Sequence, residues 1–197
     1  ATVLVAPTWG DSSIFNTCGR ELIGVLLDAG YRVIMRPHYQ SSRQTPDLLA
    51  AVRDAFAGND RFEYVAQMGE TGSIMRSDIL VSDWSGMALE YAMGLEKPVL
   101  FIDVPRRIRN PNWEELEIEP IETSIRTEVG EVISPESLQE TPAAIERLLG
   151  DPDRFRARMR ELRKTLVFRL GHSIPDGATE IARLADEAAA ARAGRSQ

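Results

Sequence analysis

A short polar turn between two apolar stretches holds the residues of this chain that are best suited to bind an anion. Residues 77–103 read SDILVSDWSGMALEYAMGLEKPVLFID, in which apolar runs at 79–81 and 99–102 flank a helical pattern. The first backbone N–H groups of a helix have no partner within the helix and carry partial positive charge, which favours a phosphate. We therefore predict that Ser85 and Gly86 bind phosphate, the serine through its hydroxyl and the glycine through its accessible backbone. A helix cap without a ligand is the alternative.

His38 is the second candidate, because it directly follows an apolar run and the pair Arg36-Pro37. An imidazole can donate to a phosphate oxygen or protonate a leaving group near neutral pH. We predict that His38 takes part in the chemistry, and an exposed loop histidine is the alternative. The other histidine, His172, lies in a Gly-His-Ser loop far along the chain, and we expect no functional role for it.

Three acidic residues, Glu90, Asp83 and Asp103, lie in the same stretch of sequence. Glu90 falls one helical turn after Ser85, where its carboxylate could accept from the paired hydroxyls of a ribose. A solvated helix residue is an equal alternative. Asp83 and Asp103 each end an apolar run, as acids do in receiver domains that accept a phosphoryl group. Such a domain needs an adjacent acidic pair after its first strand, and residues 6–8, Ala-Pro-Thr, exclude that class.

Apolar runs alternate with helical patterns along the chain, which predicts an α/β fold. Strands are expected at 2–6, 31–35, 62–65, 79–81 and 99–102, and helices at about 17–28, 45–58, 87–95, 134–149, from 151 onward and after 176. Alternating units of this kind form an open parallel sheet with helices on both faces. Ligands bind at the carboxyl ends of such strands. That edge brings together Pro7-Thr8, His38, residues 67–68, residues 83–86 and Asp103, and this convergence is the strongest functional argument.

Composition excludes several classes of protein. The 197 residues are enough to bury a core, and we expect one domain over 1–187 with a frayed tail at 188–197. The net charge of −7 argues against nucleic-acid binding, and no apolar run approaches a membrane span. The single cysteine, Cys18, fits a reducing compartment. No spacing is typical of a metal site, and we predict neither a metal nor a cofactor. Since the chain opens at Ala1 inside a strand-like run, we expect it to be a piece of a longer protein.

One helical segment is strongly basic. Its cations are Arg154, Arg156, Arg158, Arg160, Arg163 and Lys164, separate from a stripe made by Phe155, Met159, Leu162 and Leu166. A basic amphipathic helix can rest on an anionic membrane surface. We favour the other reading, in which the stripe packs in the core and the arginines are solvated.

Several of these motifs resemble the CDP-glycerol glycerophosphotransferase family, the polymerases and primases of teichoic-acid-type polymers. The matching segments are Val5-Ala6-Pro7-Thr8-Trp9, Arg36-Pro37-His38, Ser77 to Ser85, Lys97-Pro98-Val99 and Asp176-Gly177. The resemblance covers most of the chain. It implies the C-terminal, donor-binding half of a GT-B fold, a Rossmann-like lobe whose partners are CDP-glycerol or a related nucleotide donor and an N-terminal acceptor lobe outside this chain.

The resemblance also implies roles for the residues. His38 would contact the donor pyrophosphate as the catalytic group, Ser85 the phosphates, and Glu90 the ribose or the glycerol. Thr8, Arg36, Asp83 and Gly86 complete the expected substrate-binding set. The implied reaction transfers glycerol phosphate to an acceptor hydroxyl and releases CMP, in the cytoplasm and with membrane contact at its inner face as a further expectation. Alternatives are another GT-B enzyme, such as a UDP-sugar glycosyltransferase or a UDP-GlcNAc 2-epimerase, and a non-catalytic nucleotide-binding lobe.

Overall fold

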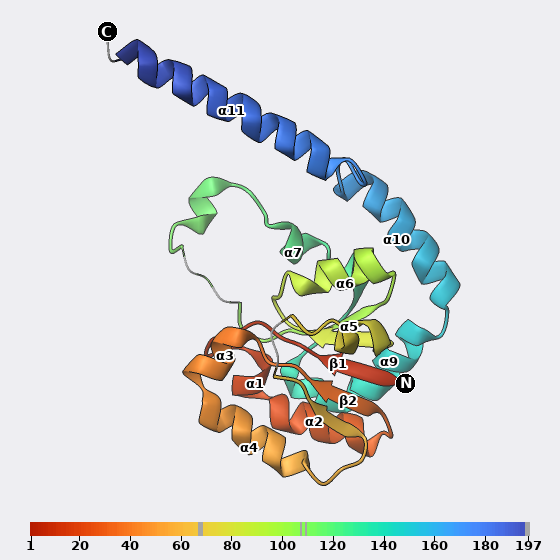
Figure 1. The fold of residues 1–197 in the computed structure, drawn as a ribbon. Helices are drawn as coiled ribbons and strands as arrows, with labels where there is room; N and C mark the ends of the chain where they lie inside the picture. Colours follow the sequence, from red (N-terminus) through yellow and green to blue (C-terminus); the bar gives the residue numbers. More distant parts are fainter. Residues whose placement is uncertain (67–68, 107, 109, 196–197) are drawn as a thin grey trace. The chain divides into compact units, whose positions relative to one another are not determined.

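Six short, mostly buried strands form a single parallel sheet in the computed structural model, which describes residues 1–66, 69–106, 108 and 110–195. The strands are β1 (Thr2–Val5), β2 (Arg32–Met35), β3 (Phe62–Tyr64), β4 (Ile79–Ser82), β5 (Val99–Ile102) and β6 (Gly130–Ile133). Their order across the sheet is β3-β2-β1-β4-β5-β6, and every neighbouring pair is parallel. The predicted α/β class with an open parallel sheet is confirmed (Figure 1).

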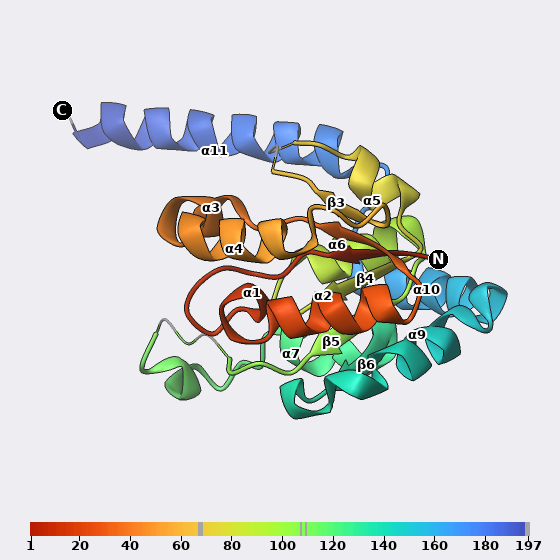
Figure 2. The ribbon, with the colours of Figure 1, turned by 90° about the horizontal axis from the view of Figure 1, so that it is seen from below.

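Helices cover both faces of the sheet (Figures 1 and 2). The helices are α1 (Ile14–Thr17), α2 (Gly19–Asp28), α3 (Tyr39–Gln44), α4 (Pro46–Phe56), α5 (Gly72–Arg76), α6 (Met87–Leu95), α7 (Ile121–Ser124), α8 (Arg126–Val129), α9 (Thr141–Leu149), α10 (Pro152–Leu166) and α11 (Ser173–Arg195), with 3-10 helices η1 (Trp113–Leu116) and η2 (Pro135–Glu140). Helices α2, α4 and α9 lie on one face, whereas α5 and α6 lie on the other. Strands β4 and β5 are therefore buried along their whole length, as continuous apolar runs in a covered parallel sheet should be.

The strand order reverses at β1, which pairs with β2 on one side and β4 on the other. The chain adds strands outward from β1 to β3, then returns across the sheet to β4 and continues to β6. A crevice opens outside the carboxyl ends of the strands at such a reversal, because the flanking connections leave on opposite faces. The topology therefore puts a ligand crevice between the connections that follow β1 and β4.

The sequence patterns missed β6 and the short helices α1, α3, α5, α7 and α8, which have four to six residues each. Strand β6 reads Gly-Glu-Val-Ile, a pattern too short and too polar to stand out. Its first residue, Gly130, allows a close approach to β5, because a Cβ there would lie 1.7 Å from the carbonyl oxygen of Val99. The backbone pairing of β5 and β6 thus depends on glycine at this position.

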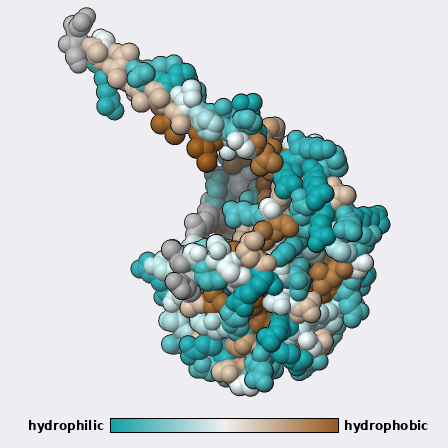
Figure 3. Space-filling view, turned by 45° about the vertical axis from the view of Figure 1, so that its right-hand side comes forward, coloured by the Kyte–Doolittle hydropathy of each residue, from teal (hydrophilic) through white to brown (hydrophobic). Residues whose placement is uncertain are grey.

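The chain divides into two compact units, Ala1–Arg160 and Glu161 onward. The second unit contains the end of α10 and the long α11, so helix continues through the residues expected to fray. Hydrophobic side chains gather along one side of α11 in Figure 3, where Ile174, Ile181 and Leu184 are exposed. The single domain over 1–187 stays a prediction.

Candidate functional site

A cleft of about 210 Å³ opens at the carboxyl ends of β1, β2, β3 and β4. It is lined by Ala6, Pro7, Arg36, Pro37, His38, Tyr39, Val65, Ala66, Ser85 and Met87. Three of the seven predicted site residues, Arg36, His38 and Ser85, therefore meet at one cavity although they come from separate stretches of the chain. Residues 67–68, which were expected at the same edge, lie outside the described residues.

His38 is held by the helix that follows it. It is the N-cap of α3, and its Nδ1 accepts a hydrogen bond of 3.1 Å from the backbone N–H of Gln40. The Trp9 ring lies nearly parallel to the imidazole at a centroid distance of 6.1 Å. Because an accepting Nδ1 carries no proton, this geometry describes a neutral imidazole whose proton is on Nε2. His38 is thus oriented to offer an Nε2–H donor.

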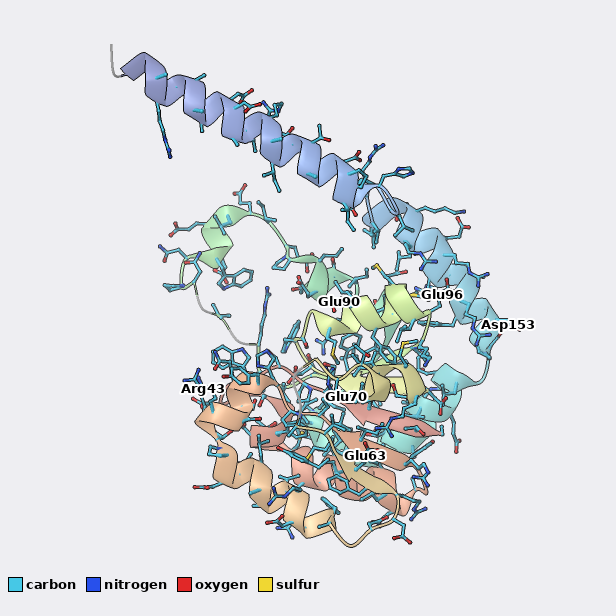
Figure 4. The ribbon with its side chains drawn as sticks, viewed as in Figure 1. Arg43, Glu63, Glu70, Glu90, Glu96 and Asp153 are labelled. Atoms are coloured by element: carbon cyan, nitrogen blue, oxygen red, sulfur yellow. The ribbon has the colours of Figure 1, made fainter. Side chains whose placement is uncertain are left out.

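The Arg36 guanidinium is held between two elements. Its Nη1 lies 3.2 Å from the Met87 sulfur at the start of α6, and its Nη2 donates to the Glu70 carbonyl oxygen over 3.2 Å. The Glu70 carboxylate in turn accepts from the Ser73 N–H in the first turn of α5 (Figure 4). These contacts use part of the donor capacity of a half-buried cation that lines the cleft.

Asp83 is directed into the protein rather than into the cleft. Its side chain is buried, and its two oxygens accept from the backbone N–H groups of Thr8 (2.7 Å) and Ile14 (3.2 Å). Burial raises the pKa of this carboxyl above its ordinary value of 3.8, while the N–H donors act in the opposite direction. Neither Asp83 nor Thr8 lines the cleft, so the pair fixes the loop after β1 instead of presenting side chains to the cavity.

Ser85 and Gly86 begin α6 at the mouth of the cleft. The Ser85 hydroxyl accepts a long hydrogen bond, 3.4 Å, from the Met87 N–H, and Ser85 lines the cavity. Gly86 has ordinary right-handed backbone angles, and a Cβ added there would meet nothing within 4 Å. The space outside Gly86 is therefore open to a ligand, but the backbone conformation does not itself require glycine.

Glu90 lies in the first turn of α6 and is exposed (Figure 4). It is not among the residues that line the cleft. Its role in binding a ribose or a glycerol stays a prediction.

The amino end of β4 carries a second polar group of motif residues. The Tyr91 hydroxyl lies 2.9 Å from the Ser77 hydroxyl, and Lys97 Nζ donates to the carbonyl oxygens of Met75 (2.7 Å) and Ser77 (2.6 Å). Burial raises the pKa of Tyr91 and lowers that of Lys97. These residues join α5, α6 and β5 and lie away from the cleft lining.

Sequence reasoning missed a cation near the turn, Arg126 at the start of α8. It is buried and forms an ion pair of 2.7 Å with Asp103, the residue after β5. Its guanidinium carbon lies 4.0 Å from the centre of the Trp84 ring. No sequence signal could have identified Arg126, because short aperiodic elements surround it.

The arginines of α10 are engaged with acids of the protein. Arg158 pairs with Glu128 over 2.5 Å, and Arg160 pairs with Glu96 over 2.9 Å. This arrangement agrees with a solvated basic face more than with one that binds lipid. Among the described residues, no helix has the length and apolar character needed to cross a bilayer. In the same part of the chain, no group of three or more His, Cys, Asp or Glu residues is arranged to hold a metal ion.

Residues 1–105 match the family model described as CDP-glycerol:poly(glycerophosphate) glycerophosphotransferase. No curated protein compared with the chain matches it.

Solved structures share the fold at low sequence identity. The glycotransferase of kitacinnamycin aligns with a TM-score of 0.57 and 14% identity, over 92% of this chain and 42% of its own. UDP-GlcNAc 2-epimerase of Methanocaldococcus jannaschii, in complex with UDP-GlcNAc and UDP, gives 0.50 and 13%, over 83% and 45%. WaaG, a glycosyltransferase involved in lipopolysaccharide biosynthesis, gives 0.50 and 14%, over 91% and 46%. The chain spans less than half the length of these proteins and has the Rossmann-like fold of the C-terminal half of a GT-B protein.

Proposed function

Because the chain belongs to the CDP-glycerol:poly(glycerophosphate) glycerophosphotransferase family, we propose that it is the lobe that binds the nucleotide donor of such a transferase. The donor is CDP-glycerol or a related nucleotide diphosphate of a polyol. An acceptor lobe outside this chain binds the acceptor, whose hydroxyl attacks, and supplies the base that takes the proton of that hydroxyl. The transfer takes place in the cytoplasm.

The observation that carries this proposal is the convergence of Arg36, His38 and Ser85 on one cleft. A cation, an imidazole N–H and a hydroxyl are the donors that a pyrophosphate needs. The cleft of about 210 Å³ is smaller than the ~300–1,000 Å³ typical of pockets that enclose a whole ligand. This supports a donor that is held only partly by this lobe.

The chemistry follows from where negative charge develops. The acceptor oxygen forms a bond to the β-phosphorus of CDP-glycerol, the bond from that phosphorus to the bridging oxygen breaks, and CMP leaves with the electron pair. The His38 Nε2–H, the Ser85 hydroxyl and the α6 N-terminus stabilise the charge on the phosphate oxygens. Asp83, through the Thr8 and Ile14 N–H groups, keeps the β1 loop in place.

Gly86 and Glu90 contribute to binding from α6. The open space outside Gly86 admits the donor close to the helix N-terminus. Glu90, one turn further, accepts from the ribose or the glycerol hydroxyls.

Calorimetry of the chain with CMP, CDP-glycerol, CDP-ribitol and UDP-N-acetylglucosamine tests the proposal. We expect a cytidine nucleotide to bind and the UDP-sugar to bind at least ~10-fold more weakly, a difference of about 1.4 kcal/mol. Tighter binding of the UDP-sugar favours a sugar transferase or an epimerase. A two-lobed protein that binds CDP-glycerol but transfers no glycerol phosphate favours a non-catalytic lobe.

A matched pair of serine variants locates the site. Ser85→Ala should weaken CMP binding at least ~10-fold, because a hydrogen bond to a charged group contributes ~1.5–3 kcal/mol. Ser134→Ala is the control, because the Ser134 hydroxyl also accepts from a backbone N–H two residues along the chain, but Ser134 is the N-cap of η2 and is not part of the cleft lining. Equal affinity in the two variants would remove Ser85 from the site.

A further inference from the structure

The Arg126 guanidinium lies over two aromatic rings, one of which belongs to the turn that follows β4. Its carbon lies 4.0 Å from the centre of the Trp84 ring and 4.9 Å from that of Phe101. Arg106 approaches the same indole at 5.7 Å, so Arg126 makes the closer contact. Since Arg126 is only 6% exposed, this stack is shielded from solvent.

Trp84 links this stack to the cleft, because it stands between Asp83 and Ser85. Its Nε1–H donates to the Val104 carbonyl oxygen over 2.8 Å. The turn is thus anchored on one side by Asp83, which binds the loop after β1, and on the other by Trp84, which binds the segment after β5. The orientation of Ser85 follows from these two anchors.

The position is demanding for a cation. Within the described part of the chain, Arg126 Nε and Nη2 are buried without hydrogen-bond partners, and only Nη1 reaches a carboxylate, that of Asp103. Unsatisfied buried donors destabilise a fold. A hydrophobic residue would fill this space without that penalty, so the ion pair alone does not account for a planar cation here, and its remaining contact is with the Trp84 and Phe101 rings.

We propose that Arg126 is a positioning residue for the phosphate-binding turn: it holds Trp84 so that Ser85 and the N-terminus of α6 face the cleft. This inference rests on the proposed donor-binding function. It assigns a positioning role to a residue outside the segment 1–105 that matches the family.

Three variants separate stacking from charge. Arg126→Gln removes the charge, whereas Arg126→Lys keeps the charge beside Asp103 but lacks the planar face. Arg147→Gln is the control, because Arg147 also pairs with an acid next to the sheet, Glu131 of β6, and has no contact with Trp84. If Arg126→Gln does not fold, Arg126→Lys tests the stack and Asp103→Asn tests the charge: Asp103→Asn removes the ion pair but leaves the stack in place, so it should bind CDP-glycerol like the wild type, and a tenfold loss in it would overturn the inference.

Trp84 itself reports the effect in a background with Trp9→Phe and Trp113→Phe. We expect acrylamide quenching of Trp84 to rise in both Arg126 variants and CDP-glycerol affinity to fall about tenfold, because small displacements of binding groups are costly. Arg147→Gln should change neither quantity. CDP-glycerol affinity is measured without urea, where each variant is folded. A variant that is only less stable should then bind CDP-glycerol as tightly as the wild type.

The outcomes are distinguishable. Unchanged affinity in Arg126→Gln overturns the inference, and so does full recovery of both readouts in Arg126→Lys, which would assign the effect to charge. A wild-type chain that binds no nucleotide contradicts the proposed function alone. In that case hydrogen exchange of the N–H groups of residues 84–87 decides: faster exchange in Arg126→Gln than in Arg147→Gln supports the positioning role, and equal exchange overturns it.

Discussion

The two ends of β4 carry motif residues of similar polarity that have different surroundings. At the amino end, Ser77, Tyr91 and Lys97 hydrogen-bond to one another or to backbone carbonyls within the protein. At the carboxyl end, the Ser85 hydroxyl has one long contact with the residues that the structure describes, and Ser85 lines a cleft. Polar groups that are satisfied internally stabilise the fold, whereas groups left open toward a cavity are available to a ligand.

Asp83 lies at the carboxyl end of β4, but its hydrogen bonds are satisfied within the protein, as they are for the residues at the amino end. Both of its oxygens accept backbone N–H groups, so it supports the site without facing it. The hydrogen-bond partners of a residue, and not its place in a motif, therefore distinguish residues that support the site from residues that are open to a ligand. Each prediction below tests that separation.

The largest effect is expected for His38→Asn in the two-lobed enzyme. Asparagine is a good N-cap, so α3 keeps its first turn, but the Nε2–H donor is lost. Turnover should fall ~100-fold or more, as it does when a transition-state donor is removed. The free energy of unfolding, measured in urea, should change by less than about 0.5 kcal/mol. Near-normal turnover would remove His38 from the mechanism.

Asp83→Asn should lower both stability and affinity. An asparagine offers one acceptor oxygen, so one of the two N–H groups of Thr8 and Ile14 loses its partner at a cost of about 1–3 kcal/mol. Chemical denaturation and CMP titration check the two effects. A variant as stable as the wild type would contradict the anchoring role.

The same carboxyl predicts a pH dependence of stability. Its folded pKa is raised above its ordinary 3.8, so its contribution to stability is fully present below that value and is lost as pH rises through the folded pKa. The free energy of unfolding of the wild type minus that of Asp83→Asn should therefore decrease as pH rises across this window. Urea unfolding at a series of pH values measures it, and a difference that increases with pH would be evidence against a raised pKa.

Tyr91→Phe should affect the fold and leave the site unchanged. The phenol hydroxyl contacts the Ser77 hydroxyl and its carbonyl, so removing it should cost about 1–2 kcal/mol of unfolding free energy. CMP affinity should match that of the wild type. A weaker affinity would show that the two ends of β4 are coupled.

Glu90→Gln should have the smallest effect, because this carboxylate is exposed. If it binds the ribose, CMP and CDP-glycerol should weaken alike by about 1 kcal/mol. If it binds the glycerol, only CDP-glycerol should weaken. Calorimetry separates the cases, and no change for either ligand would exclude Glu90 from the site.

The fold was largely predictable because its elements are strongly patterned. Runs such as 79–81 and 99–102 are continuous and apolar, and α2 and α4 have clear helical periodicity. Strand β6 was not predictable, since it is recognised only through its pairing with β5. Short helices such as α3 are likewise defined by caps and by packing.

The location of the site was more predictable than the side chains that face it. Parallel topology alone brings Arg36, His38 and Ser85 to one edge. It does not say which way a side chain at a strand end points, so Asp83 was expected among the ligand contacts. Arg126 reaches Trp84 only through the tertiary fold, which sequence spacing does not encode.

The close approach at Gly130 also bears on self-association. Strand β6 covers the side of β5, whose sequence Val-Leu-Phe-Ile would otherwise present unpaired N–H and carbonyl groups beside apolar side chains. Such an uncovered edge is a template for strands of other molecules. Strand β6 ends the sheet instead with Glu131, which is charged and paired with Arg147. By letting this strand come near enough to pair, a missing methyl group makes a charged strand, and not the apolar β5, the edge of the sheet.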